Sequence, residues 1–206
     1  MPAVCGVRIW CARLISIDRT PEFALRLPKA KAALAYAEQS HAGQQRSADG
    51  APFILHPVEV GTLLYDAGAP EAVISAGVLH DTLEKTDATA YELYARFGRH
   101  VGQIVYAVTD DARIAGYARR KDALRSKVAN AGEDALTVFA ADKISKVREL
   151  RLGGGSEIKV RSRRMRHYRR CLAMLQERLP DSALVATLAR ELETLSDARA
   201  VLASPR

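Results

Sequence analysis

The sequence lacks the features that would mark a membrane, exported or disulfide-bonded protein. No apolar run approaches the roughly 18 residues of a transmembrane helix. Arg8 and Arg13 interrupt the apolar stretches near the N-terminus, and no small-residue cleavage site follows, so no export signal is expected. The 3 cysteines, Cys5, Cys11 and Cys171, fit neither a disulfide framework nor a CxxC metal site. We therefore expect a protein of the reducing cytoplasm.

The composition is that of an ordinary globular protein, with 48% hydrophobic and 27% charged residues. A chain of 206 residues is long enough for one well-buried core and short for two, so a single domain is expected. The 31 Lys and Arg against 24 Asp and Glu give a net charge of +7. This charge favours polyanionic partners, which include nucleotides, nucleic acid and acidic lipids, without discriminating among them.

Strand-like alternation is nearly absent, and apolar residues recur at helical spacing along almost the whole chain. One such stripe comprises Leu27, Ala30, Leu34 and Ala37 and ends at His41. Glycine and proline clusters separate the predicted helices. The sequence therefore predicts an all-α, single-domain bundle of about eight or nine helices. They are expected at residues 27–41, 57–67, 71–85, 90–97 and 99–109, within 110–132, and at 133–152, 159–179 and 182–203.

Four polar residues at or beside core-facing positions suggest a metal site. His80 and Asp81 end the apolar stretch AVISAGVLHD, where a buried carboxylate needs a partner such as a divalent ion. A His–Asp pair also occurs on solvated helix surfaces, which is the simpler interpretation of this segment alone. His56 opens another helix, and Asp142 interrupts the apolar stripe FAADKI. Two imidazoles and two carboxylates suit manganese, iron or zinc better than calcium, and they leave coordination positions for water and substrate.

Two residues after this pair are candidates for catalysis. Glu84 lies four residues after His80, so a continuous helix would place it on the same face, where it could orient or deprotonate a metal-bound water. The alternative is a surface carboxylate. Lys85 lies one turn after Asp81 and either holds a phosphate or forms a solvated salt bridge.

The segments HAGQQRSADGAPFILHPVEV, AGVLHDTLEKTDAT, FGRHVGQIVYAVTDD and AADKISKVREL follow one another between residues 28 and 152. In this order they resemble the hydrolase domain of the RelA/SpoT group, and the chain is similar in length to the free-standing small alarmone hydrolases. The resemblance implies the HD-domain fold. It also implies manganese-dependent removal of the 3′-pyrophosphate from guanosine tetra- or pentaphosphate, the (p)ppGpp of the stringent response.

The same resemblance implies roles for individual residues. The four polar residues described above correspond to the metal ligands, and Arg46 to the arginine expected against the guanine base. Lys143 and Lys146 are expected to bind nucleotide and phosphates, and Glu84 to act on the attacking water. No synthetase domain is recognised, so synthesis is not predicted.

Three positions depart from the family pattern. The chain has Glu84-Lys85 where the family usually has Glu-Asp, Ser47 where a lysine is common, and Lys146 where an asparagine often contacts the nucleotide. Lys85 would slow, alter or abolish hydrolysis if the second carboxylate helps to activate water, or it would bind an additional phosphate. The alternatives are therefore a hydrolase of another 2′- or 3′-phosphorylated nucleotide, or a degenerate hydrolase that serves as a nucleotide sensor.

The domain boundaries follow from the matched segments: an N-terminal extension at 1–26, the hydrolase core at 27–153, and C-terminal helices at 154–206 that pack on the core. The basic run at 159–170 could bind nucleic acid. An amphipathic helix with solvated arginines is the favoured interpretation, so we expect neither nucleic acid nor a membrane as partner. The expected partner is a phosphorylated nucleotide; the sequence leaves the oligomeric state open. The apolar side of that helix would comprise Val160, Met165, Tyr168, Cys171, Leu172 and Leu175.

Overall fold

A computed structural model describes residues 20–152 and 158–203. Cys5, Cys11, Trp10 and the three glycines at 153–155 lie outside the described residues. Within these two ranges the fold is all-α, as predicted, and the only β-type pairing is an isolated bridge between Gln45 and Pro52. No described helix combines the length and the apolar character needed to span a membrane.

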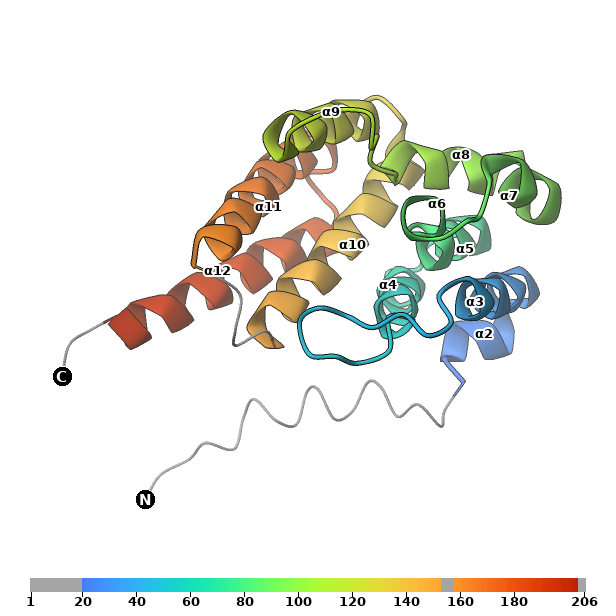
Figure 1. Ribbon diagram of the computed structural model, residues 1–206, viewed down its shortest axis with the longest axis horizontal. Helices are drawn as coiled ribbons and strands as arrows, with labels where there is room; N and C mark the ends of the chain where they lie inside the picture. Colours follow the sequence, from blue (N-terminus) through green and yellow to red (C-terminus); the bar gives the residue numbers. More distant parts are fainter. Residues whose placement is uncertain (1–19, 153–157, 204–206) are drawn as a thin grey trace, which may run out of the picture.

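The helices pack as a bundle around α10, which runs through the middle of the molecule (Figure 1). Its central position explains why its apolar stripe is almost completely buried. The helices are α2 (Glu22–Arg26), α3 (Pro28–Ser40), α4 (Leu55–Asp66), α5 (Glu71–Leu79), α6 (Thr82–Lys85), α7 (Ala90–Phe97), α8 (Arg99–Val108), α9 (Tyr117–Ala129), α10 (Glu133–Leu152), α11 (Ile158–Arg178) and α12 (Ala183–Ala203).

The predicted helix at 71–85 is in fact two helices. Side chains donate hydrogen bonds to two carbonyl oxygens that would accept from backbone N–H groups if the helix continued. His80 Nδ1 donates to the carbonyl oxygen of Gly77 at 2.6 Å, and Thr82 Oγ1 donates to that of Leu79 at 2.7 Å. In an uninterrupted helix these two carbonyls would accept from backbone N–H groups four residues later. The break leaves His80 and Asp81 in a turn between α5 and α6.

The short helix α2 was not predicted, since five residues are too few to show a helical period. It lies within the last part of the predicted N-terminal extension, and its Phe23 and Ala24 are buried in the core. Phe23 packs close to Gly61 of α4.

Two glycines allow α4 and α5 to approach closely. A Cβ at Gly77 would lie 2.2 Å from Leu64 Cδ1, and a Cβ at Gly61 would lie 2.7 Å from Val78 Cγ2. Larger residues at either position would force the two helices apart. Since α4 begins beside His56 and α5 ends beside His80, this close packing brings the two imidazoles together.

The C-terminal helices cover α10. The side chains of Met165, Tyr168, Cys171 and Leu175 are buried on α11, whereas its arginines at 163, 166, 169 and 170 are exposed. This pattern agrees with the predicted amphipathic helix. The side chain of Val160 lies outside the described residues. On α12, Glu191 accepts from Arg148 of α10 at 2.7 Å, which fastens the last helix to the central one.

Candidate metal site and adjoining cavity

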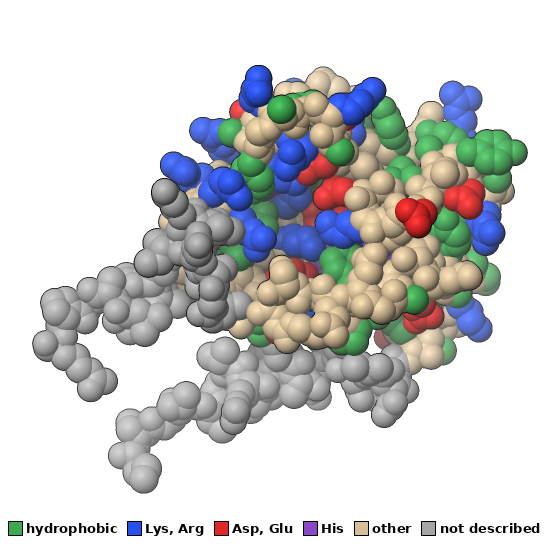
Figure 2. Space-filling model, viewed as in Figure 1, with side chains coloured by type: hydrophobic (Ala, Val, Ile, Leu, Met, Phe, Trp, Pro, Cys, Tyr) green, Lys and Arg blue, Asp and Glu red, His purple; other side chains and the backbone are tan. Residues whose placement is uncertain are grey.

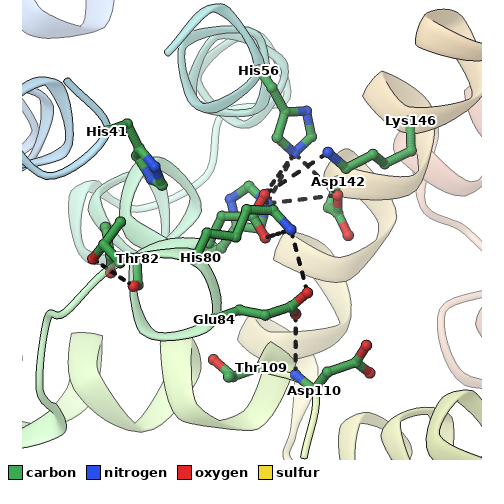
Figure 3. Close-up of polar contacts among 12 residues, drawn as sticks. His41, His56, His80, Thr82, Glu84, Thr109, Asp110, Asp142 and Lys146 are labelled. Atoms are coloured by element: carbon green, nitrogen blue, oxygen red, sulfur yellow. Dashed lines mark hydrogen bonds and ion pairs between the residues drawn. The ribbon is translucent and has the colours of Figure 1, made fainter. Parts of the chain in front are cut away.

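The structure brings the four predicted metal ligands together in one buried cluster (Figure 3). His56 comes from the first turn of α4, His80 and Asp81 from the break after α5, and Asp142 from α10. The two Nε2 atoms are 3.0 Å apart, and Asp142 Oδ1 lies 3.3 Å from His56 Nε2 and 3.6 Å from His80 Nε2. Asp81 Oδ2 lies 3.5 Å from each Nε2.

Hydrogen bonds on the far side of each imidazole fix which nitrogen faces the cluster. His80 Nδ1 lies 2.6 Å from the Gly77 carbonyl, which can only accept, so this nitrogen carries the proton. His56 Nδ1 lies 2.7 Å from Ser145 Oγ, whose own hydrogen is donated to Glu59 Oε2 at 2.7 Å. Ser145 must therefore accept from His56. With Nδ1 protonated in both rings, the neutral form of each imidazole directs its Nε2 lone pair into the cluster, as metal-binding histidines do.

The carboxylates complete a donor set that suits a cation. Asp81 Oδ2 and Asp142 Oδ1 are buried and have no hydrogen-bond partner among the described residues. Burial opposes their ionisation, yet the pKa of Asp81 is held well below its usual range by His80 and the nearby lysines, and that of Asp142 by Lys143. Two imidazole lone pairs and two unpartnered anionic oxygens fit a divalent transition metal.

The residues that contact His56 Nδ1, on the side of the ring away from the cluster, were not predicted from the sequence. Besides Ser145, Glu149 Oε1 lies 3.2 Å from His56 Nδ1 and is also buried without a hydrogen-bond partner. Glu59, which holds Ser145, accepts from Arg148 at 2.9 Å. The available signal was spacing, because positions three and seven residues after Asp142 lie on the same face of α10.

The two predicted catalytic residues lie beside the cluster, on the short helix α6. Glu84 is partly exposed, and its Oε2 accepts from the backbone N–H of Asp110 at 3.4 Å. Lys85 Nζ donates to Glu84 Oε1 at 3.3 Å and lies 3.6 Å from Asp81 Oδ1. The break after α5 overturns the continuous-helix argument, but α6 still directs Glu84 toward the cavity described next.

A cavity of about 920 Å³ opens next to the cluster, and Lys and Arg side chains gather along one side of the hollow in the surface and within it, beside acidic side chains (Figure 2). All three predicted substrate-binding residues line it. Arg46 is buried and donates from Nε to Asp49 at 3.1 Å, Lys143 pairs with Asp142, and Lys146 lies 3.8 Å from Asp81 Oδ2. Several other residues also line the cavity: Phe53, Tyr117, Lys121, Arg164, His167 and Tyr168.

His167 is a buried neutral histidine at one wall of this cavity, not a surface residue. Its Nδ1 accepts from Arg125 at 2.9 Å, which requires an unprotonated nitrogen. Burial, and then the cations of Lys143, Lys121 and Arg125, lower its pKa to about 2, opposed only weakly by Asp142. The folded protein therefore excludes a proton that the unfolded chain binds below pH 6.5.

Acid is accordingly expected to destabilise the protein through His167. Because the pKa of His167 is depressed in the folded protein, its contribution to the free energy of unfolding is complete above pH 6.5. This contribution decreases at lower pH, by about 2 kcal/mol at about pH 5. Urea unfolding near pH 7.5 and pH 5 measures this loss. A His167→Gln variant should lose about 2 kcal/mol less than the parent protein over that interval. An equal loss in both proteins would assign the acid sensitivity to other groups.

Known proteins are similar to this chain in sequence. The family model described as the HD domain matches residues 33–151. The guanosine-3′,5′-bis(diphosphate) 3′-pyrophosphohydrolase of Aquifex aeolicus is 32% identical over 117 residues, covering 56% of this chain and 17% of that protein. A probable enzyme of the same name from Synechocystis is 46% identical over 77 residues, covering 37% of this chain and 10% of that protein. The chain thus spans less than a fifth of the length of these relatives.

A solved structure supports the same comparison over a larger share of the fold. It is described as a metazoan ortholog of SpoT that hydrolyzes ppGpp and plays a role in starvation responses. It superposes with a TM-score of 0.71 at 26% sequence identity, covering 83% of this chain and 95% of that chain. The similarity therefore extends over nearly the whole length of that protein.

Proposed function

The chain belongs to the HD-domain family, and from this premise we propose that it is a metal-dependent phosphohydrolase that removes the 3′-pyrophosphate of guanosine 3′,5′-polyphosphates. The observation that carries the proposal is the cluster of two imidazole lone pairs and two unpartnered carboxylate oxygens beside a cavity lined by cations. A site of this kind binds a divalent ion and a polyanionic substrate next to each other. The relatives named above supply the substrate class.

We assign the metal to His56, His80, Asp81 and Asp142, with Mn²⁺ as the preferred ion. Their mixed nitrogen and oxygen donors suit Mn²⁺ better than Ca²⁺. When bound, such an ion polarises a phosphoryl oxygen and lowers the pKa of water. The side chains of the protein then have to orient the substrate and transfer protons.

In this mechanism Glu84 accepts the proton of the attacking water. The water oxygen forms a bond to the phosphorus attached to the 3′-oxygen, and the bond from this phosphorus to the 3′-oxygen breaks. The 3′-oxygen leaves as a hydroxyl with a proton taken from solvent water, and Glu84 returns the proton it accepted to solvent. Arg46 contacts the guanine, while Lys143 and Lys146 neutralise phosphate charge. Both products, the 5′-phosphorylated nucleoside and pyrophosphate, then leave through the open cavity.

We also propose that residues 27–153 form the hydrolase core, with 1–26 as an extension and 154–206 as helices that support α10, and that the protein acts in the cytoplasm. The contact between Arg148 and Glu191 supports the role of the last helices. The buried free thiol of Cys171 is compatible with a reducing compartment.

The direct test is pyrophosphate release from guanosine tetraphosphate by the purified protein, with and without added Mn²⁺. Release that requires the ion would support the proposal. A protein that binds Mn²⁺ but releases no pyrophosphate would refute this substrate. Lys85 beside Asp81 favours a nucleotide sensor as the second candidate, and such a protein would bind the nucleotide tightly without turnover.

A further inference from the structure

Two lysines from different helices converge on one side of the metal cluster. Lys85 Nζ, from α6, and Lys146 Nζ, from α10, lie 5.7 Å and 5.3 Å from the centre of the Phe53 ring. They also approach opposite oxygens of Asp81, at 3.6 Å from Oδ1 and 3.8 Å from Oδ2. Both side chains line the cavity, with 30% and 22% of their surfaces exposed.

The ammonium groups of these lysines lie at longer distances from their acidic partners than those of two other lysines of the cavity. The acidic partners of Lys85 and Lys146 lie between 3.3 and 3.8 Å away, so most of their N–H donors remain available to a ligand. By contrast, Lys143 pairs closely with Asp142, and Lys121 with Asp110. Lys85 and Lys146 are therefore readily available donors near the metal cluster.

The surrounding structure positions both ammonium groups near the Phe53 ring and the Asp81 carboxylate. Gln44 Nε2 donates to the carbonyl oxygen of Lys85 at 2.9 Å, and its Oε1 accepts from His41 Nδ1 at 2.9 Å, which fixes the turn that carries Lys85. The face of the Phe53 ring attracts both cations. Two cations that face the same cavity bind a group with several negative oxygens better than a group with few.

Asp81 links this pair to the metal. Its carboxylate partly neutralises both lysines, and it is also one of the proposed metal ligands. A divalent ion at the cluster would share that negative charge, and both ammonium groups would then attract an anion more strongly. The donors closest to the cluster would thus face substrate phosphates beside the ion.

We propose that Lys85 and Lys146 form a paired-ammonium subsite that binds the terminal phosphate of a 3′-diphosphate, so that the protein selects a diphosphate over a monophosphate at that position. The inference rests on the proposed function for the placement of the 3′-group at the metal. The terminal phosphate is the only part that distinguishes these two substrates, and it adds the negative oxygens that the pair would bind. Lys85 thereby has a function that differs from that of the acidic residue usual in the family.

Calorimetric titration with inorganic pyrophosphate and inorganic phosphate tests the subsite without requiring turnover. The titrations use Mn²⁺-loaded protein with equal free Mn²⁺ in cell and syringe. The parent protein should bind pyrophosphate at least about 10-fold more tightly than phosphate. The Lys85→Met/Lys146→Met variant should lose about 10- to 100-fold in pyrophosphate affinity and much less in phosphate affinity. Lys31→Met, an exposed lysine on α3 outside the cavity, is the matched control.

The outcomes separate this inference from the proposed function. Unchanged pyrophosphate affinity in the double variant, with its Mn²⁺ content intact, would overturn the subsite even if the parent protein hydrolyses guanosine tetraphosphate. Lysine-dependent preference for pyrophosphate in a protein that hydrolyses no guanosine polyphosphate would support the subsite and refute the proposed function. In an active protein, the ratio of kcat/KM for 3′-diphosphate over 3′-monophosphate substrates should fall about 10-fold in the double variant.

Discussion

Asp81→Ala is expected to abolish both stable Mn²⁺ binding and pyrophosphate release. The change removes a buried carboxylate whose Oδ2 lies 3.5 Å from both histidine Nε2 atoms and has no hydrogen-bond partner among the described residues. A catalytic metal supplies several kcal/mol of transition-state stabilisation, so kcat/KM should fall at least about 1,000-fold. Metal content after gel filtration and initial rates of release measure the two effects.

The matched control for this variant is Asp87→Ala, which removes an exposed carboxylate six residues further along the chain. It should retain both metal and activity. Thermal unfolding of each variant without metal shows whether the fold is intact. An Asp81→Ala protein that keeps a full complement of Mn²⁺ and the activity of the parent protein would remove Asp81 from the ligand set.

Glu84→Gln is expected to lower kcat about 100- to 1,000-fold while Mn²⁺ affinity stays nearly unchanged. Glutamine keeps the size of the side chain and can still accept from the backbone N–H of Asp110, but it cannot take a proton from water. Since the proposed role of Glu84 is to act on the water and not to hold the metal, the loss should appear in kcat and not in metal content.

Steady-state kinetics with Mn²⁺ in excess measures this effect, and Glu38→Gln on the exposed face of α3 is the control. The rate of Glu84→Gln should not recover at higher Mn²⁺ concentration, whereas a ligand variant would recover in part. A kcat within about threefold of the parent protein would assign the proton transfer to another group.

The helical fold could be predicted because its helices carry local signals. The apolar stripe of α10 and the proline and glycine breaks are visible in the sequence, and the predicted bounds of α7, α8 and α10 agree closely with those observed. The break at His80 could not be predicted in this way. It depends on side-chain hydrogen bonds to the Gly77 and Leu79 carbonyls, and these local bonds leave no trace in the spacing of the apolar residues.

The candidate site shows the same division between local and long-range signals. Motifs led to the four clustered residues and to Arg46, because each lies in a short recognisable segment. Ser145 and Glu149 lie in the same segment as Asp142 and on the same face of α10, but only the packing of α4 on α10 shows that both approach His56. His167 could not be linked to the cavity, since α11 reaches it through contacts with distant parts of the chain.

The four clustered residues come from positions 56, 80, 81 and 142, so an ion bound to them would cross-link three separate parts of the bundle. Such an ion binds the folded chain and not the unfolded one, and at about 100 times its Kd it adds about 2.7 kcal/mol to the free energy of unfolding. Chelation would then do more than stop turnover. It would destabilise α4, the end of α5 and the middle of α10 together. The metal supply would then also determine the lifetime of the folded protein.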